Sequence, residues 1–293
     1  FSSSQAPTLG FVLGSQADIR DLAASRGWLT TDPNMSNLFS RTHSVNLNLR
    51  STIEPLPRFK IMLTASRRYA LNESEYFRNN SDSDGDGIAD DFGTPNWESL
   101  SPTKTGNFNI SFVAIKTSFV NDGVDNSSQL FNNFVNYRFD IAQRLGMENG
   151  LLTNSQSYPD GYGPNSQEVL IPAFLAAYSG ASPDKQSLNN FPSIPLPNWN
   201  INYDGLIKIK WFKERFKNIS MTHSYRSTYS IGSFISNLNF GSEDFIFDGN
   251  GNYLPEFQID QVAITEQFAP FLKFDMTMKN SITARVEYKK DRS

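Results

Sequence analysis

The sequence predicts an all-β fold and favours the wall of an antiparallel transmembrane β-barrel over a soluble β-sandwich. Apolar and polar residues alternate over most of the chain, which is the pattern of strands with one apolar and one polar face. The alternating segments are longer than the strands of about five or six residues that are common in globular sheets. The clearest segment, residues 199–211, has a tryptophan at each end of its apolar face, as the aromatic girdles of outer-membrane barrels require.

Period-two alternation predicts seven antiparallel strands joined by turns or loops. They are residues 45–53, 59–65, 108–119, 199–211, 219–231, 262–278 and 282–288, with a tight turn at residues 279–280. In residues 199–211, Ile207 shares the apolar face with Trp199, whereas Asn202 and Lys208 lie on the polar face. Steps of about 3.3 Å, tilted by roughly 45°, give this segment a height of about 28 Å, close to the apolar band of an outer-membrane barrel.

The predicted strands do not satisfy the parity of a closed barrel. Bacterial barrels usually have an even number of strands, so seven would not close on themselves. The short connections at residues 55–58 and 212–217 are expected on the same side of the membrane, which requires an even number of strands between them. Three are predicted there, so either one strand is missed or one turn is misread.

Three long insertions interrupt the strands, at about residues 72–106, 121–198 and 232–260. The second contains two helical stretches. In the first stretch, apolar residues recur at helical spacing from Leu130 to Leu145. The other, residues 168–178, is apolar and carries Pro172, which is expected to start or kink it. Loops of this length usually carry function.

A calcium-type loop is the sharpest local motif. Its expected ligands, four carboxylates and one backbone carbonyl, are Asp82, Asp84, Asp86, Ile88 (through its carbonyl) and Asp90. The pattern resembles the calcium loops of dockerin and thrombospondin type 3 repeats, but Gly93 stands where an acidic ligand is usual. A solvated acidic loop is the alternative. A structural Ca²⁺ ion is the one cofactor that the sequence suggests, and no cofactor is required.

No residues support an enzyme. The two histidines, His43 and His223, lie far apart in the sequence and are expected to be packing or interface residues. The chain has no cysteine and no nucleophile motif, and Asp248 with its neighbouring glycines and asparagines predicts a plain turn. The net charge of −4 and the absence of a Lys/Arg cluster exclude a typical nucleic-acid partner. No apolar run is long enough for a transmembrane helix.

Six segments, in order along nearly the whole chain, resemble the C-terminal part of the SprA/Sov family. They are residues 14–20 (GSQADIR), 46–55 (NLNLRSTIEP), 166–178 (SQEVLIPAFLAAY), 194–203 (IPLPNWNINY), 223–229 (HSYRSTY) and 264–270 (ITEQFAP). That family supplies the outer-membrane translocon of the type IX secretion system of Bacteroidota. Its members are very large single-chain barrels, so the resemblance implies that residues 1–293 are one segment of a larger transmembrane β-barrel with no independent domain.

The resemblance implies a protein-conducting channel in the outer membrane. Folded cargo proteins with C-terminal signal domains would pass through it, and in gliding species these include adhesins. The implied partners are the rest of the barrel, a shuttle-type outer-membrane barrel, a periplasmic plug protein, the secreted cargo and the lipid bilayer. Two alternatives stay open at this point: a soluble secreted β-rich calcium-binding module, and an import barrel like the TonB-dependent receptors.

Overall fold

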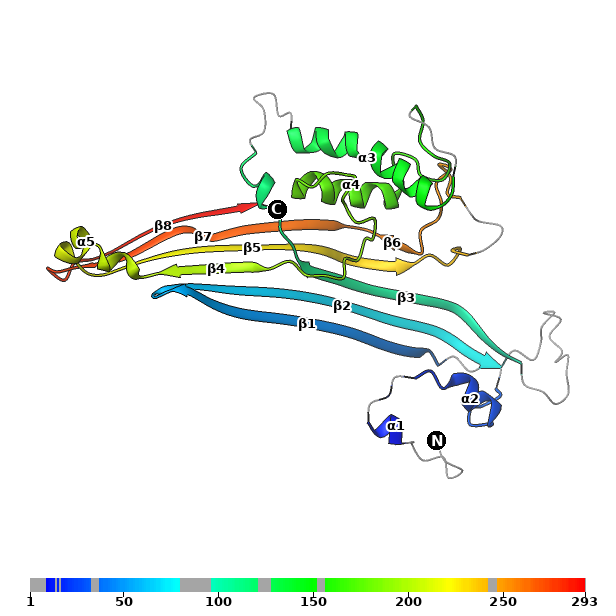
Figure 1. Cartoon of the computed structure of the whole chain (residues 1–293). Coiled ribbons are helices and arrows are strands. Elements are labelled where there is room, and N and C mark those ends of the chain that lie inside the picture. Colours follow the sequence, from blue (N-terminus) through cyan, green and yellow to red (C-terminus); the bar gives the residue numbers. More distant parts are fainter. Residues whose placement is uncertain are drawn as a thin grey trace. The chain divides into compact units, whose positions relative to one another are not determined.

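The structure is a computed structural model, and it describes residues 9–13, 15, 17–32, 37–79, 96–120, 128–151, 156–241 and 247–292. The described part is mostly antiparallel β-sheet, with 47% of the described residues in strands and 22% in helices (Figure 1). The all-β prediction is therefore confirmed. Within these residues no helix is both long enough and apolar enough to cross a membrane.

In the described part of the chain, eight strands form one sheet. They are β1 (Phe39–Leu56), β2 (Phe59–Asn79), β3 (Trp97–Ser111), β4 (Asn198–Tyr203), β5 (Phe216–Ser236), β6 (Phe257–Ile259), β7 (Val262–Met278) and β8 (Thr283–Arg292). Neighbours follow the order β1-β2-β3-β5-β7-β8. In addition, β4 pairs with β2 and β5, and the short β6 pairs with β5. The sheet is therefore a meander whose two edge strands are β1 and β8.

Strands β3 and β4 occupy one position in the sheet. Both run antiparallel to β5. Ser111 of β3 pairs with Thr228, and Trp199 of β4 pairs with Tyr225, which precedes Thr228 by only three residues on β5. The chain therefore leaves the sheet after Ser111, forms a helical insertion, and returns to the same line at Asn198. The parity conflict disappears, because two of the three predicted strands share one position.

The predicted strand over residues 199–211 is wrong beyond Tyr203. A 3₁₀ helix, η2 (Gly205–Lys208), and a short helix, α5 (Lys210–Arg215), follow β4. The cause is the loss of a partner: Tyr203 pairs with Phe59, the first residue of β2, so β4 has no neighbour on that side beyond this point. Ile207 and Trp211 therefore do not lie on a strand, and residues 212–217 are not a simple turn.

Other predicted boundaries also shift. The strand expected at residues 108–119 ends at Ser111, begins earlier, and is followed by a 3₁₀ helix, η1 (Ile115–Thr117). The insertion expected at 72–106 is shorter on both sides, because β2 continues to Asn79 and β3 starts at Trp97. The expected 232–260 loop likewise loses residues to β5, and it contains β6. The strands at 45–53, 59–65, 219–231 and 262–278 are confirmed and longer than or equal to their predicted extents.

The insertion between β3 and β4 contains both predicted helices, α3 (Gln129–Glu148) and α4 (Gln167–Ser179). The hydroxyl of Ser128 caps α3 by accepting a hydrogen bond from the backbone N–H of Phe131. Pro172 lies inside α4 and is buried, and α4 ends at Gly180, whose φ of 70° is left-handed. Ile141 and Leu145 of α3 pack against Val169 and Ala173 of α4, so the helices form a small core of their own.

The chain divides into two compact units. One comprises Phe1–Thr42 and Asn72–Lys104, and the other comprises His43–Leu71 and Thr105–Ser293. In the first unit, α2 (Arg20–Ser25) begins with Arg20, whose guanidinium lies 4.5 Å from the centre of the Phe39 ring. Its hydrogen bonds to the side chain of Asp18 lower the pKa of that carboxyl to about 2. The second unit carries the features described below.

Candidate functional site

The sheet of the second unit has one apolar and one polar face. Cross-strand pairing joins Met221 of β5 to Phe274 of β7, and Phe274 to Val286 of β8. On the other side of β5, Tyr225 pairs with Trp199 of β4, and their rings stack 4.4 Å apart. Because side chains alternate between faces along a strand, these paired residues all lie on the same face. Apolar residues therefore continue from β4 to β8 across one side of the sheet.

One half of this apolar face is covered by the helical insertion. Ile171 and Leu175 of α4 pack against Phe108 of β3 and against Tyr229 and Ile231 of β5. All five side chains are buried, and Phe191 of the segment that leads back to β4 packs against the same cluster. This half is an ordinary protein core, with α4 lying over the strands (Figure 1).

The other half of the apolar face, called here the bare half, lies beyond the helical insertion. Ile219 and Phe268 within it are buried, but its apolar side chains on the two edge strands are exposed. On β8, Val286 is 59% exposed and Tyr288 is 58% exposed. On β1, Leu49 is 53% exposed, and it shares this face because its neighbour Arg50 contacts the sulfur of Met62 on the polar face. Along β7 the bare half corresponds to residues 268–278, of which Phe268 is buried and Leu272 is 36% exposed. Soluble proteins rarely leave a continuous apolar surface of this kind bare.

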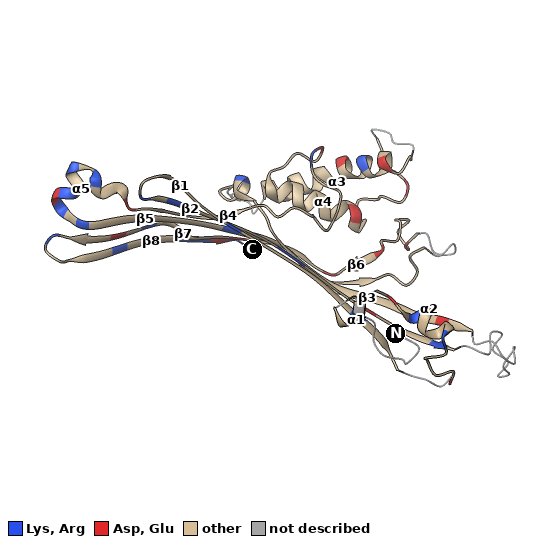
Figure 2. Ribbon diagram, turned by 60° about the horizontal axis from the view of Figure 1, so that its bottom comes forward, with Lys and Arg blue, Asp and Glu red and all other residues tan. Residues whose placement is uncertain are grey.

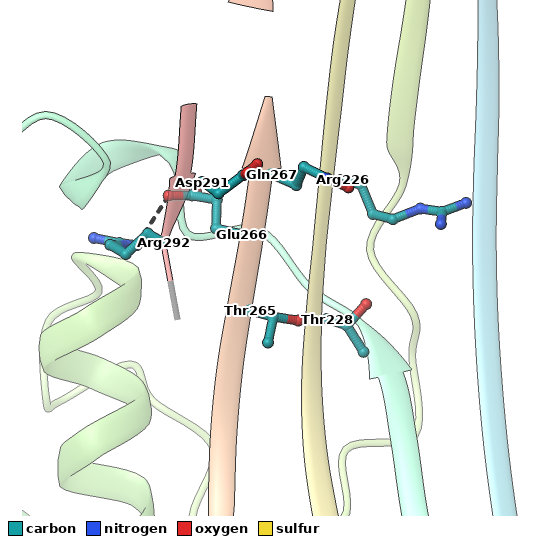
Figure 3. Close-up of a pocket in the computed structure, with 7 residues that line it drawn as sticks. All are labelled: Arg226, Thr228, Thr265, Glu266, Gln267, Asp291 and Arg292. Carbon is teal, nitrogen blue, oxygen red and sulfur yellow. Dashed lines mark ion pairs between the residues drawn. The ribbon is translucent and has the colours of Figure 1, made fainter. Parts of the chain in front are cut away.

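The polar face carries hydroxyl, amide and guanidinium groups. Asn200 of β4 donates a hydrogen bond to the hydroxyl of Ser224 on β5. Next to them, Arg226, Thr228, Thr265 and Gln267 line a shallow hollow of about 360 Å³. Figure 3 shows the Arg226 side chain extending across the sheet, away from Gln267. Two neighbouring hollows on this face also include Arg226, together with Arg50 and Thr64. All three hollows contain hydroxyl, amide and guanidinium side chains, which water solvates well.

A buried polar cluster lies where the covered and bare halves meet. The hydroxyl of Tyr225 donates to Glu266 at 2.6 Å and accepts from the backbone N–H of Ala114 at 2.9 Å. Arg292 of β8 forms an ion pair with Glu266 at 3.2 Å (Figure 3). It also donates a hydrogen bond to the carbonyl of Thr117 at 2.8 Å. The Glu266 side chain is only 2% exposed. The cluster therefore fastens the first residues of the insertion to β5, β7 and β8.

A second set of hydrogen bonds fastens the other end of the insertion. The Ser111 hydroxyl donates to the carbonyl of Leu196 at 2.7 Å and accepts from the backbone N–H of Ser66 at 3.0 Å. The side-chain carbonyl of Asn198 accepts from the N–H of Ser227 at 2.8 Å. The split strand is thus closed by buried polar side chains, each with a partner, at both ends of the break.

The predicted calcium loop is not among the residues that the structure describes. Asp82, Asp84, Asp86, Ile88 and Asp90 lie outside the described residues, so the calcium loop stays a prediction. Among the residues that the structure does describe, no cluster of three or more His, Asp or Glu side chains is arranged to hold a metal.

His223 is a packing residue of the apolar face. Its ring lies 5.7 Å from that of Phe271, and its Nδ1 is within hydrogen-bond distance of the Phe271 carbonyl oxygen. His43 lies on β1 and is exposed. The turn predicted at Asp248 is confirmed: its carboxylate accepts hydrogen bonds from the backbone N–H groups of Asn250 and Asn252. None of these residues assembles a nucleophile with a base.

Glu266 and Arg292 were not predicted as functional residues, although the sequence carries a signal for them. Glu266 stands between Ile264 and Phe268, on the face of β7 that is otherwise apolar. A charge on an apolar face needs a buried partner, and Arg292 is paired with it in the register of β7 and β8. Comparison with known proteins adds no identification: neither a family model nor a curated protein matches this chain.

Proposed function

We propose that this chain forms a section of the wall of a very large transmembrane β-barrel, and that the barrel is the protein-conducting outer-membrane channel of a type IX secretion system. The observation that carries the membrane assignment is the bare half of the apolar face. Lipid chains would cover Leu49, Val286 and Tyr288, while the polar face with Arg226 would line an aqueous lumen. The secretion role is what the SprA/Sov resemblance implies.

The dimensions of the bare half support this assignment. Residues 268–278 of β7 are ten steps long and span about 33 Å at about 3.3 Å per step. Tilted by roughly 45°, they give a height of about 23 Å, close to the ~25 Å apolar band of outer-membrane barrels. A membrane strand needs about 9–11 residues, so the remaining length of β5 and β7 would project beyond the lipid.

The edges of the sheet favour a barrel that is larger than this chain. β1 has 18 residues and β8 has 10, and both lie at the ends of the strand order. Long edge strands present unpaired backbone groups, and inside a lipid bilayer every such group must be paired. Further strands of the same barrel would supply those partners. Folded cargo, a shuttle-type barrel and a periplasmic plug are the other partners that we propose for the complete channel.

The experiment is to isolate outer membranes in mild detergent, capture the chain with an antibody, and measure its denatured mass and its co-purifying proteins. The proposal predicts extraction only with detergent, a mass far above 33 kDa, and a second barrel protein in the eluate. A species of 33 kDa that is soluble without detergent would contradict it and favour the calcium-binding module. A parent chain with an N-terminal plug domain that imports a small ligand would favour the TonB-dependent type of barrel.

A further inference from the structure

Three chain connections meet at the end of the sheet that lies beyond the bare apolar half. They are the β1–β2 turn around Arg58, the η2–α5 segment, and the β7–β8 turn around Lys279. The backbone N–H of Asp204 donates to the carbonyl of Arg58 at 3.1 Å, and that of Lys279 donates to the carbonyl of Arg215 at 3.0 Å. The three connections therefore form one continuous surface, called here the basic end.

The basic end concentrates positive charge in a chain whose net charge is −4. The expectation that the chain has no Lys/Arg cluster is therefore wrong at this place. Its cationic residues are Arg58, Lys60, Lys208, Lys210, Lys213, Arg215, Lys217 and Lys279. Figure 2 shows the Lys and Arg residues gathered on and around α5. Glu54, Asp204 and Glu214 are its acidic residues. None of the eight cations forms an ion pair with a carboxylate in the described residues, although Lys217 donates to the Ser281 hydroxyl.

Large apolar side chains are exposed between these charges. Leu56 is 63% exposed, Ile209 51%, Trp211 53% and Ile282 54%. The guanidinium of Arg215 lies 4.6 Å from the centre of the Trp211 ring, and the Phe212 ring meets the tryptophan edge-on at 4.8 Å. Tryptophan beside Lys and Arg is the composition of segments that lie at the boundary between headgroups and lipid chains.

We propose that the basic end binds anionic phospholipid headgroups at the membrane surface. The inference rests on the proposed function, because it places the basic end where the bare apolar half would leave the hydrocarbon. Exposed Ile209 and Trp211 would enter the boundary layer, and the unpaired cations around them would contact headgroup phosphates. A purely acidic protein partner would account for the charges but would leave the exposed apolar side chains without a role.

The test measures which lipids surround Trp211. The protein is reconstituted into vesicles that contain either brominated phosphatidylcholine or brominated phosphatidylglycerol at an equal mole fraction, and the signal of a Trp211→Phe variant is subtracted from the tryptophan quenching. A surface cation contributes about fivefold to partitioning toward anionic lipid. We therefore expect brominated phosphatidylglycerol to quench Trp211 several-fold more effectively than brominated phosphatidylcholine.

The variant that tests the charges is Lys208→Gln with Lys213→Gln, which should bring the two quenching efficiencies close together. Its matched control is Lys116→Gln with Lys185→Gln, two exposed lysines of the helical insertion, which should leave the preference unchanged. Addition of glycerol phosphate at millimolar concentration should also leave it unchanged. Loss of the preference with that soluble anion would indicate a simple anion site and would overturn the inference.

A separate reporter distinguishes failure of this inference from failure of the proposed function. Val286→Trp places a tryptophan on the bare apolar face. If that residue is quenched by brominated lipid while Trp211 is quenched equally by both lipids, or by neither, the lipid preference of the basic end is refuted and the membrane assignment stands. If neither tryptophan is quenched, the membrane assignment itself fails, and the inference fails with it.

Discussion

Replacing Val286 of β8 with lysine tests whether the bare apolar face meets lipid. In water the cost would be small, because Val286 is already 59% exposed. Full burial of a valine side chain is worth about 1.5 kcal/mol, so the two fifths that are buried contribute about 0.6 kcal/mol. In lipid the lysine would cost about 2–4 kcal/mol near the middle of the bilayer. The two environments therefore predict free energies of unfolding that differ by more than the error of a denaturant titration.

The assay is reversible urea unfolding of the protein in phospholipid vesicles, followed by the fluorescence of its tryptophans. Thr283→Lys is the matched control, because Thr283 lies on the same strand, three positions away and on the opposite face. We expect Val286→Lys to lower the free energy of unfolding by about 2 kcal/mol or more, and Thr283→Lys to change it by less than about 0.5 kcal/mol. Equal and small effects of the two substitutions would refute the assignment of this face to lipid.

Three further predictions concern the covered half and its junction. Arg292→Met leaves the Glu266 carboxylate buried without its cation, so we expect a loss of about 3 kcal/mol in urea unfolding, partly recovered by adding Glu266→Gln. Gly106→Ala would place a Cβ 2.2 Å from a backbone carbonyl oxygen of β2 and 2.4 Å from the Phe234 ring; we expect a cost of about 2 kcal/mol, and an unchanged unfolding midpoint would contradict the close approach. Burial raises the pKa of the Glu168 carboxyl on α4, so its charged form is disfavoured in the folded state. Glu168→Gln should therefore stabilise the protein at neutral pH. The gain should decrease as the pH falls through the raised folded-state pKa and be lost once the pH is below the unfolded pKa of Glu; a gain that does not depend on pH would exclude burial of the charge as its cause.

Period-two alternation located the strands wherever one face of the strand is mainly apolar and the other mainly polar along its length. In β5 and β7 this face is mainly apolar both under α4 and beyond it, with Glu266 of β7 as the charged exception, so alternation continues through both halves. Alternation therefore does not show which part of the apolar face the helical insertion covers. That difference depends on the insertion between β3 and β4, whose position over one half of the sheet follows from contacts between residues such as Leu175 and Tyr229, far apart in the sequence.

Alternation failed where a strand loses its neighbour. Residues 205–211 keep the alternation of a strand. However, β2 starts at Phe59, which pairs with Tyr203, so β2 has no residue left to pair with those after Tyr203. The chain forms η2 and α5 there instead. Hydrogen bonding to a neighbour is a non-local condition that a local pattern does not contain. The same holds for the strand position shared by β3 and β4, which appears in the sequence as two strands and in the sheet as one interrupted strand.

The interruption also bears on where lipid would end. At its two sides, Ser111, Asn198 and Glu266 are buried polar side chains, and each has a hydrogen-bond or ion-pair partner in the protein. Such groups are costly in hydrocarbon, which offers them no partners, whereas residues 268–278 of β7 place only apolar side chains on the same face apart from the bulge near Pro270. Under the proposed membrane assignment, the polar cluster around Glu266 would therefore mark one boundary of the lipid and the basic end the other. The helical insertion would then lie outside the hydrocarbon, where the backbone of its loops can be solvated.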